Sequence, residues 1–328
     1  MPGIISIERG CMKSGLKLVI LVFSFLALLS ACEGGNDTPP NPPPVSTGKW
    51  TWVSGSNTID QAGTYGTLGT AAPSNVPGAR GQAVCWIDPQ GKLWLFGGFG
   101  YDSASNNDLW KYDPATLAWT WVSGSSTGNQ AGTYGTLGTA ASSNVPGGRN
   151  WGAVSWTDSS GKLWLFGGTG YDSAGNYDHL NDLWKYDPTT LEWTWVSGSN
   201  TVNQTGIYGT QGTAASSNVP GAREGAVSWI DSQGKLWLFG GSSGGELNDL
   251  WKFDPATLEW TWVSGSNAVS QRGVYGTKGT AASSNVPGAR GGAVSWIDSQ
   301  GRLWLFGGVG NDSAGNLGDL NDLWHYIR

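Results

Sequence analysis

Short runs of apolar residues, each closed by a turn sequence, follow one another along most of the chain. Between residues 82 and 122 there are four such runs, at Gln82–Ile87, Leu93–Phe96, Asp108–Tyr112 and Trp119–Val122. In the last run the two Trp side chains alternate with Thr and Val, which is the period of a β-strand with two different faces. Asp-Pro-Gln-Gly follows the first run and Asp-Pro-Ala-Thr follows the third, and both sequences are typical of turns. The pattern predicts four short antiparallel strands.

The same unit is repeated along the chain. The segment Trp-Thr-Trp-Val-Ser-Gly-Ser begins at Trp50, Trp119, Trp193 and Trp260. Five Trp in each of four units account for 20 of the 21 Trp, and Trp151 alone lies outside the pattern. A fixed period of this kind indicates units that pack on their neighbours, so we expect most Trp to pack between strands and sheets. No segment beyond the N-terminal region has a helical period, and helices should be nearly absent.

A Gly-Gly pair closes the second strand of each unit, and a Trp follows it after a variable loop. The pairs begin at Gly97, Gly167, Gly240 and Gly307, and the Trp are Trp110, Trp184, Trp251 and Trp324. This arrangement resembles the kelch repeat, whose units form the blades of β-propellers. The resemblance covers residues 48–328 and implies an all-β fold, a β-propeller of four kelch-type four-stranded blades. Each unit exceeds the usual kelch length of about 50 residues because it carries an insert before its first strand.

The two ends of the repeat region complement each other. The last unit stops at Arg328, after its third strand Asp322–Tyr326, and has no Trp-Thr-Trp strand of its own. We expect Trp50–Val53, near the N-terminus, to pair in this last blade, close the ring and cover an open strand edge. A ring closed in this way is a monomer. In the alternative, two chains share one larger ring and each N-terminal strand completes its neighbour's blade.

The first 47 residues differ from the repeats. The segment Lys13–Leu29 has a basic start and an apolar run too short to span a bilayer comfortably. The Leu-Ser-Ala-Cys sequence ending at Cys32 resembles the lipoprotein box of bacterial signal peptides, which implies cleavage before Cys32 and attachment of lipid to it. We therefore expect a signal peptide over residues 1–31, with Met12 as a second candidate start, and a proline-rich tether over residues 32–47. The expected location is the bacterial cell envelope, anchored in the membrane through Cys32.

Charge and cysteine content narrow the partners further. The formal net charge is −6, which makes a nucleic-acid partner unlikely. Cys85 is the only one of three Cys within the repeats, so the fold has no internal disulfide. The other units carry Ser at its position, and we expect a buried thiol there.

Candidate binding residues come from the longer loops. The loops after the second and fourth strands are long and leave by one face, where binding is expected. The candidate ligand-binding residues are Tyr65, Tyr134, Tyr208 and Tyr275 in the inserts, and Arg80, Arg149, Arg223 and Arg290 before the first strands. The Tyr set suits sugars or peptides, and exposed Arg would attract anions. Alternatively, each Tyr packs its own loop and each Arg bonds the backbone or one of the Asp residues, which are Asp108, Asp182, Asp249 and Asp322.

Catalysis has little support in the sequence. The two His, His179 and His325, belong to no Ser-His-acid or His-Glu metal motif. Some kelch-like propellers resemble galactose oxidase, whose copper ligands find no matching motif here. We expect a non-catalytic binding scaffold for a protein or a glycan, with no metal and no cofactor. The alternatives are a propeller enzyme (a copper oxidase of the galactose-oxidase type or a loop-built hydrolase), which convergent His or carboxylates at the ring mouth would favour, and a chiefly structural surface protein.

Overall fold

The computed structural model describes residues 48–102 and 104–328. The predicted signal peptide, Cys32 and the tether lie outside the described residues. Among the residues that are described, no helix is long and apolar enough to cross a membrane. The chain divides into two units, Met1–Thr51 and Trp52–Arg328, and the fold below is that of the second unit.

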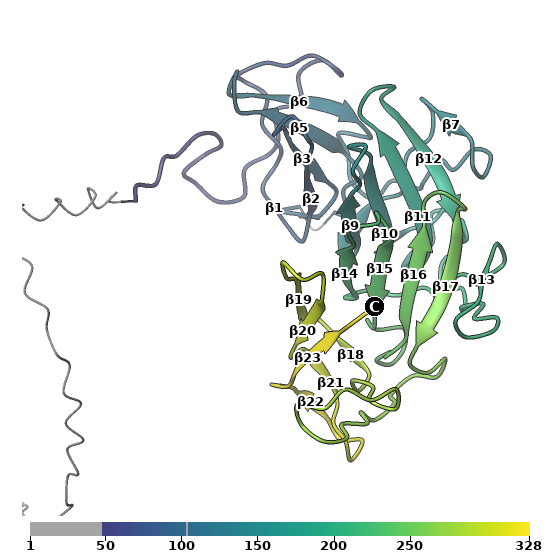
Figure 1. The fold of residues 1–328 in the computed structure, drawn as a ribbon. Coiled ribbons are helices and arrows are strands. Elements are labelled where there is room, and N and C mark those ends of the chain that lie inside the picture. The colour runs from purple at the N-terminus through teal and green to yellow at the C-terminus, as the bar shows by residue number, and fades with distance from the viewer. Residues whose placement is uncertain (1–47, 103) are drawn as a thin grey trace, which may run out of the picture. The chain divides into compact units, whose positions relative to one another are not determined.

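Four antiparallel sheets, here called the first to fourth blades, follow one another along the chain (Figure 1). The first contains β2 (Val84–Ile87), β3 (Leu93–Phe96), β5 (Leu109–Asp113) and β6 (Ala118–Ser123). The second contains β9 (Val154–Thr157), β10 (Leu163–Tyr171), β11 (Tyr177–Asp187) and β12 (Glu192–Ser197). The third contains β14 (Val227–Ile230), β15 (Leu236–Phe239), β16 (Leu250–Asp254) and β17 (Glu259–Ser264). The fourth has three strands, β19 (Val294–Ile297), β20 (Leu303–Phe306) and β23 (Leu323–Tyr326).

The inner strands β2, β9, β14 and β19 lie next to one another in that order. The all-β fold of repeated antiparallel sheets predicted from the repeats is therefore confirmed, and the four strands predicted for the first blade are present within two residues of their expected ends. Gln82, the expected start of the first strand, has a positive φ of 57°, which interrupts extended backbone.

Short ribbons extend each blade beyond its Gly-Gly pair. They contain β1 (Arg80–Gly81) with β4 (Phe99–Gly100), β8 (Arg149–Trp151) with the end of β10, and β18 (Arg290–Gly291) with β21 (Val309–Asn311) and β22 (Leu317–Asp319). The Gly pair makes this junction possible. Gly98 has a φ of 95°, and a Cβ there would lie 2.6 Å from the Gly81 carbonyl oxygen, while its N–H donates to the Arg149 carbonyl of the next blade at 2.7 Å. A side chain would disrupt both contacts.

The core lies between successive blades. Trp86, Trp94 and Phe96 of the first blade pack with Leu163 and Tyr186 of the second, and the other two junctions repeat this arrangement. A buried indole N–H also crosses each junction to a carbonyl oxygen. These bonds run from Trp86 to Trp164 (3.1 Å), from Trp156 to Trp229 (2.9 Å) and from Trp229 to Trp296 (3.1 Å). Apolar burial and one polar bond together fix each blade against the next.

The inserts run along the outer edges of the blades. In the first insert Thr64 pairs with Val76, and the Asn75 side chain donates to the Trp119 carbonyl on the outermost strand. In the next two inserts, β7 (Ala140–Ala141) pairs with β12 and β13 (Ala214–Ala215) pairs with β17. The inserts of these two blades therefore add a short fifth strand to the sheet.

The expected closing strand is not formed. Trp50–Val53 belongs to no strand, and the Trp52 side chain is 68% exposed. In the described part of the chain, β23 pairs with β20 alone. The fourth blade thus keeps an open edge, and neither a closed ring nor its number of blades is established.

Candidate functional site

Each blade contains an aspartate that binds three other side chains. In the first blade, Asp108 accepts hydrogen bonds from both terminal nitrogens of Arg80 (2.6 and 2.7 Å), from the Tyr65 hydroxyl (2.7 Å) and from the Trp110 indole (2.7 Å). Arg80 also donates to the Gly97 carbonyl at 2.9 Å. Asp182, Asp249 and Asp322 bind the equivalent Tyr, Arg and Trp in the other blades, although in the second blade only one terminal nitrogen of Arg149 bonds Asp182. It ties the insert, the Gly-Gly turn and the third strand together.

This network accounts for the eight predicted ligand-binding residues. Arg149, Arg223 and Arg290 are buried, and Tyr134 is buried as well. Burial and the adjacent Asp carboxylate raise the pKa of all four Tyr hydroxyls, to about 12 for Tyr275. For the Arg, the alternative stated above, a bond to Asp, is therefore the arrangement present. Each Tyr instead bonds the Asp of its blade's third strand rather than packing only in its own loop, and these side chains offer little surface to a ligand.

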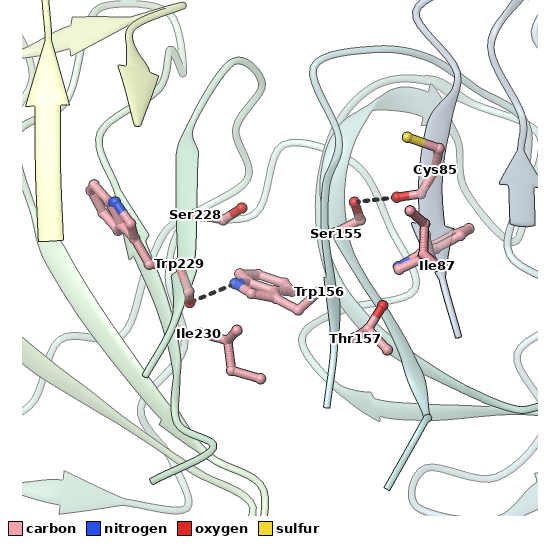
Figure 2. A pocket seen from close by; sticks show the side chains of 9 residues that line it. Cys85, Ile87, Ser155, Trp156, Thr157, Ser228, Trp229 and Ile230 are labelled. Atoms are coloured by element: carbon pink, nitrogen blue, oxygen red, sulfur yellow. Dashed lines mark hydrogen bonds between the residues drawn. The ribbon is translucent and has the colours of Figure 1, made fainter. Parts of the chain in front are cut away.

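A hollow of about 510 Å³ lies between the inner strands β2, β9 and β14. It is lined by Cys85–Ile87, Ser155–Thr157 and Ser228–Ile230, which are equivalent segments of three blades (Figure 2). Ser155 donates to the Cys85 carbonyl at 3.3 Å, and the Trp156 indole donates to the Trp229 carbonyl. Cys85 is the only ionisable residue in this lining. The hollow therefore has no pair of groups for acid–base chemistry.

The Cys85 side chain is exposed, so the expectation of a buried thiol is wrong. The reason lies in strand alternation. Trp86 points into the junction with the second blade, and its neighbour Cys85 must then point to the other side, which is the hollow.

Ionisable side chains gather instead on the ribbons beyond the Gly-Gly pairs, in what we call the rim layer. One row of three directly paired residues per blade forms it: Gly81–Phe99–Ser105, Trp151–Thr169–His179, Glu224–Ser242–Glu246 and Gly291–Val309–Asp319. Directly paired residues on neighbouring strands place their side chains on the same face. The rows of the second and third blades therefore hold one His, one Trp and two Glu close together.

Specific contacts join these two rows. The Thr169 hydroxyl donates to Glu224 Oε2 at 2.6 Å, and His179 Nε2 lies 3.8 Å from Glu224 Oε1. The other His179 nitrogen, Nδ1, lies 3.1 Å from Asp178 Oδ1. Glu246 pairs with Ser242 on the side opposite Glu224. Burial and the negative charge of Glu224 raise the pKa of the Glu246 carboxyl. The second and third blades thus share an anionic site with one histidine.

Space for Glu246 comes from the fourth blade. A Cβ at Gly291 would lie 2.8 Å from Glu246 Oε2, so any larger residue at this point would require the Glu246 carboxylate to shift. Glu246 Oε2 is buried and has no hydrogen-bond partner among the described residues. No group of three His, Cys, Asp or Glu in residues 48–102 and 104–328 has metal-binding geometry. Among these residues, the site therefore keeps one buried carboxylate oxygen, Glu246 Oε2, without a partner.

The sequence predicted neither this site nor its members. Glu224, Glu246 and His179 occur in one unit each, and a repeat pattern draws attention to residues that recur. One feature of the sequence pointed to this region. Trp151 is the single Trp outside the repeat, and its unit has one more residue than the others between the repeated Arg and the following Ala.

A family model supports the fold. The model of the KLHDC2/KLHL20/DRC7 kelch-repeats domain matches residues 66–274. One similar solved structure is that of YjhT, with 16% sequence identity and a TM-score of 0.42, covering 76% of this chain and 82% of that one. Among curated proteins, none matches the sequence.

Proposed function

The chain belongs to the kelch-repeat family, and on this premise we propose that it is a non-catalytic binding scaffold whose ligand is a protein or a glycan. The ligand would bind at the long-loop end of the blades, where the loops Phe99–Asn107, Gly170–Asn181 and their counterparts emerge. The observation that carries the proposal is the rim layer. Its exposed and ionisable side chains vary from blade to blade, whereas the repeated Arg and Tyr are committed to the fold.

Site-specific photocrosslinking in cells tests this proposal. A photoreactive phenylalanine analogue replaces Tyr101, in a long loop, or Leu117, in the short turn at the opposite end of β5; both side chains are exposed. We expect a discrete crosslinked protein, or a shift that glycosidase removes, at position 101 only. Equal crosslinking at both positions, or crosslinking at 117 alone, would contradict the proposal.

We also propose that the scaffold is held in the bacterial cell envelope by lipid on Cys32. Support comes from the basic and apolar segment before Cys32 and from the proline-rich residues that follow it. Metabolic labelling with a fatty acid should mark the protein, and Cys32→Ala should abolish the label and release the protein from membranes. A label that persists in Cys32→Ala would show a different attachment.

For the open blade, we propose that Trp50–Val53 adds to the free edge of β23 and completes the ring within one chain. The same Trp-Thr-Trp-Val sequence forms the fourth strands β6, β12 and β17 of the other blades. Deleting residues 49–56 should lower the thermal unfolding temperature markedly. Unchanged unfolding would remove the closing role, and a dimer in native mass spectrometry would favour a ring shared by two chains.

One observation favours a second candidate, a hydrolase built from the loops. Glu224 and Glu246 flank Ser242, so their backbones lie about 9–10 Å apart, and the raised pKa of Glu246 is suited to a general acid. Hydrolysis of chromogenic glycosides that is lost in both Glu224→Gln and Glu246→Gln would establish this activity and overturn the non-catalytic assignment.

A further inference from the structure

The first blade contains a second pocket, of about 290 Å³, between its insert and the long loop that follows β4. Gly63 of the insert and Tyr101 and Asp102 of the loop line this pocket, beside Tyr65 and Arg80. Pockets for drug-sized molecules measure about 300–1,000 Å³, so this one suits a smaller ligand. Three of its groups are free, although their equivalents in other blades have partners within the chain.

The first free group is the carboxylate of Asp102. In the second blade the equivalent Asp172 accepts four hydrogen bonds, two of them from the backbone and side-chain N–H groups of Asn176 (2.8 and 3.0 Å). The loop of the first blade is shorter, and its Asn106 side chain donates to a backbone carbonyl at 3.1 Å instead. Asp102 Oδ1 accepts only the Ala104 N–H, at 3.2 Å, and Oδ2 accepts no hydrogen bond within residues 48–102 and 104–328. The Asp102 carboxylate is thus available to donors of a ligand.

The second free group is the backbone N–H of Gly63. The equivalent Gly132 and Gly273 donate to the backbone carbonyl oxygens of Asp172 (3.0 Å) and Asp312 (3.2 Å). In the first blade the shorter loop provides no such carbonyl, and the Gly63 N–H has no acceptor among the described residues. A donor and an acceptor therefore line the same pocket.

The third free group is an aromatic ring. Tyr101 is 46% exposed, whereas its equivalent in the second blade, Tyr171, packs on Tyr177 with ring centroids 5.1 Å apart. The other two side chains, Tyr65 and Arg80, are held by the aspartate of the first blade. Because Arg80 is paired in this way, the pocket offers no free cation to an anionic ligand.

We propose that this pocket binds one uncharged sugar unit of a glycan. Sugar hydroxyls donate to the Asp102 carboxylate, and a hydroxyl oxygen accepts from the Gly63 N–H, because a hydroxyl group can do both. The apolar face of the sugar ring lies on Tyr101. The loop of the third blade, residues 241–248, contains neither Tyr nor Asp and cannot form this set. This inference rests on the proposed function, since it assigns a glycan to the long-loop end of the blades.

Saturation-transfer difference NMR on the full chain tests the site. The probes are the methyl glycosides of glucose, galactose, mannose and N-acetylglucosamine, each titrated separately. We expect saturable binding of at least one of them that does not change as salt is raised, because the ligand carries no charge. Asp102→Asn and Tyr101→Ala should each weaken that binding by about tenfold.

Asp312→Asn and Tyr177→Ala are the matched controls, because they make the same changes of residue type in the loops of the fourth and second blades. Both should leave sugar binding unchanged, and urea unfolding of every variant shows that the fold is retained. No saturable binding of any of the four sugars, full binding by Asp102→Asn or Tyr101→Ala, or equal weakening in the controls would overturn the inference. If position 101 still crosslinks to a protein in cells in any of these cases, the binding scaffold stands and only the sugar site is lost.

Discussion

Strands β14 and β19 have the same sequence, Val-Ser-Trp-Ile, and different surroundings. Each pairs with a Leu-Trp-Leu-Phe strand in the same register, Val227 opposite Phe239 and Val294 opposite Phe306. Yet Val227 is 8% exposed and Val294 57%, and Trp229 is 6% exposed where Trp296 is 44%. Among the described residues, the fourth blade packs against β14, and no further blade packs against β19. The repeat thus determines the strand and its pairing, while the neighbouring blade determines what is buried.

The two Trp side chains reflect this difference. Trp229 donates its indole N–H to the fourth blade, and its ring is covered by residues of the next junction. Trp296 instead stacks on Trp304 of its own blade, with ring centroids 6.0 Å apart and planes only 4° from parallel. A covering partner would bury an apolar surface that is now in contact with water.

The largest predicted effect comes from removing these two rings. Trp229→Ala should lower the free energy of unfolding by about 3–5 kcal/mol, because it opens a cavity in a packed junction. Trp296→Ala should cost about 1 kcal/mol in the open arrangement, where much of the ring is exposed, and a loss similar to that of Trp229→Ala in the closed ring proposed above. Urea unfolding measures both. Equal losses would mean that Trp296 is covered in solution, as ring closure requires.

Ion pairs of the third blade should show a similar contrast. Arg223 and Asp249 are buried and 2.7 Å apart, so Asp249→Asn should cost about 3–5 kcal/mol of unfolding free energy by leaving Arg223 without its partner. Lys235 and Asp254 lie at the surface, and Asp254→Asn should cost about 0–1 kcal/mol. Chemical denaturation compares the two, and a small loss in Asp249→Asn would mean that other groups neutralise Arg223.

A smaller effect is expected from pH at the open blade. Burial alone would raise the pKa of Asp322, but hydrogen bonds from Arg290, Trp324 and Tyr275 lower it to about 2. Since the folded pKa lies below the unfolded value of 3.8, the stabilisation is present above about pH 4 and is lost as the pH falls towards 2. Screening at this partly exposed site limits it to about 1–2 kcal/mol.

Asp322→Asn should therefore reduce the slope of stability against pH between pH 4 and 2. Urea midpoints of wild type and variant over this range provide the measurement. An unchanged slope would assign the acid sensitivity to other carboxylates.

The smallest predicted change concerns the rim layer. Deleting Asn150, the extra residue of the second unit, together with Trp151→Gly restores the spacing of the fourth blade, where Gly291 occupies the same position. Because Trp151 is largely exposed, the free energy of unfolding should change by less than about 1 kcal/mol. A loss of several kcal/mol in thermal or urea unfolding would show that the extra residue supports the fold.

Local sequence predicted the strands well, because alternation and turn residues act over a few positions. Leu93–Phe96 has its expected bounds, and the Gly-Gly pairs mark the junctions. Features that depend on neighbouring blades were not predictable in this way. Cys85 was expected to be buried, although its orientation follows from where Trp86 finds the second blade. The eight Arg and Tyr could be assigned two roles, and only their contacts with Asp decide between them.

The candidate site was the least predictable part of the molecule. Glu224 pairs with Ser242, and Ser242 with Glu246, only because the chain folds back on itself beyond the Gly-Gly turn. His179 approaches Glu224 across a blade junction, and no spacing in the sequence encodes that distance. The spacing from Arg149 to Ala153 did encode the extra residue, but its significance depends on the register that the structure supplies.

The indole bonds across the junctions have a consequence for how such a chain can change in length. Trp86, Trp156 and Trp229 all recognise a main-chain carbonyl oxygen, which any amino acid would provide. For this bond, a duplicated unit therefore needs no matching substitution in its new neighbour. Whole blades can be gained or lost in a single genetic event, while the rim residues of each diverge independently.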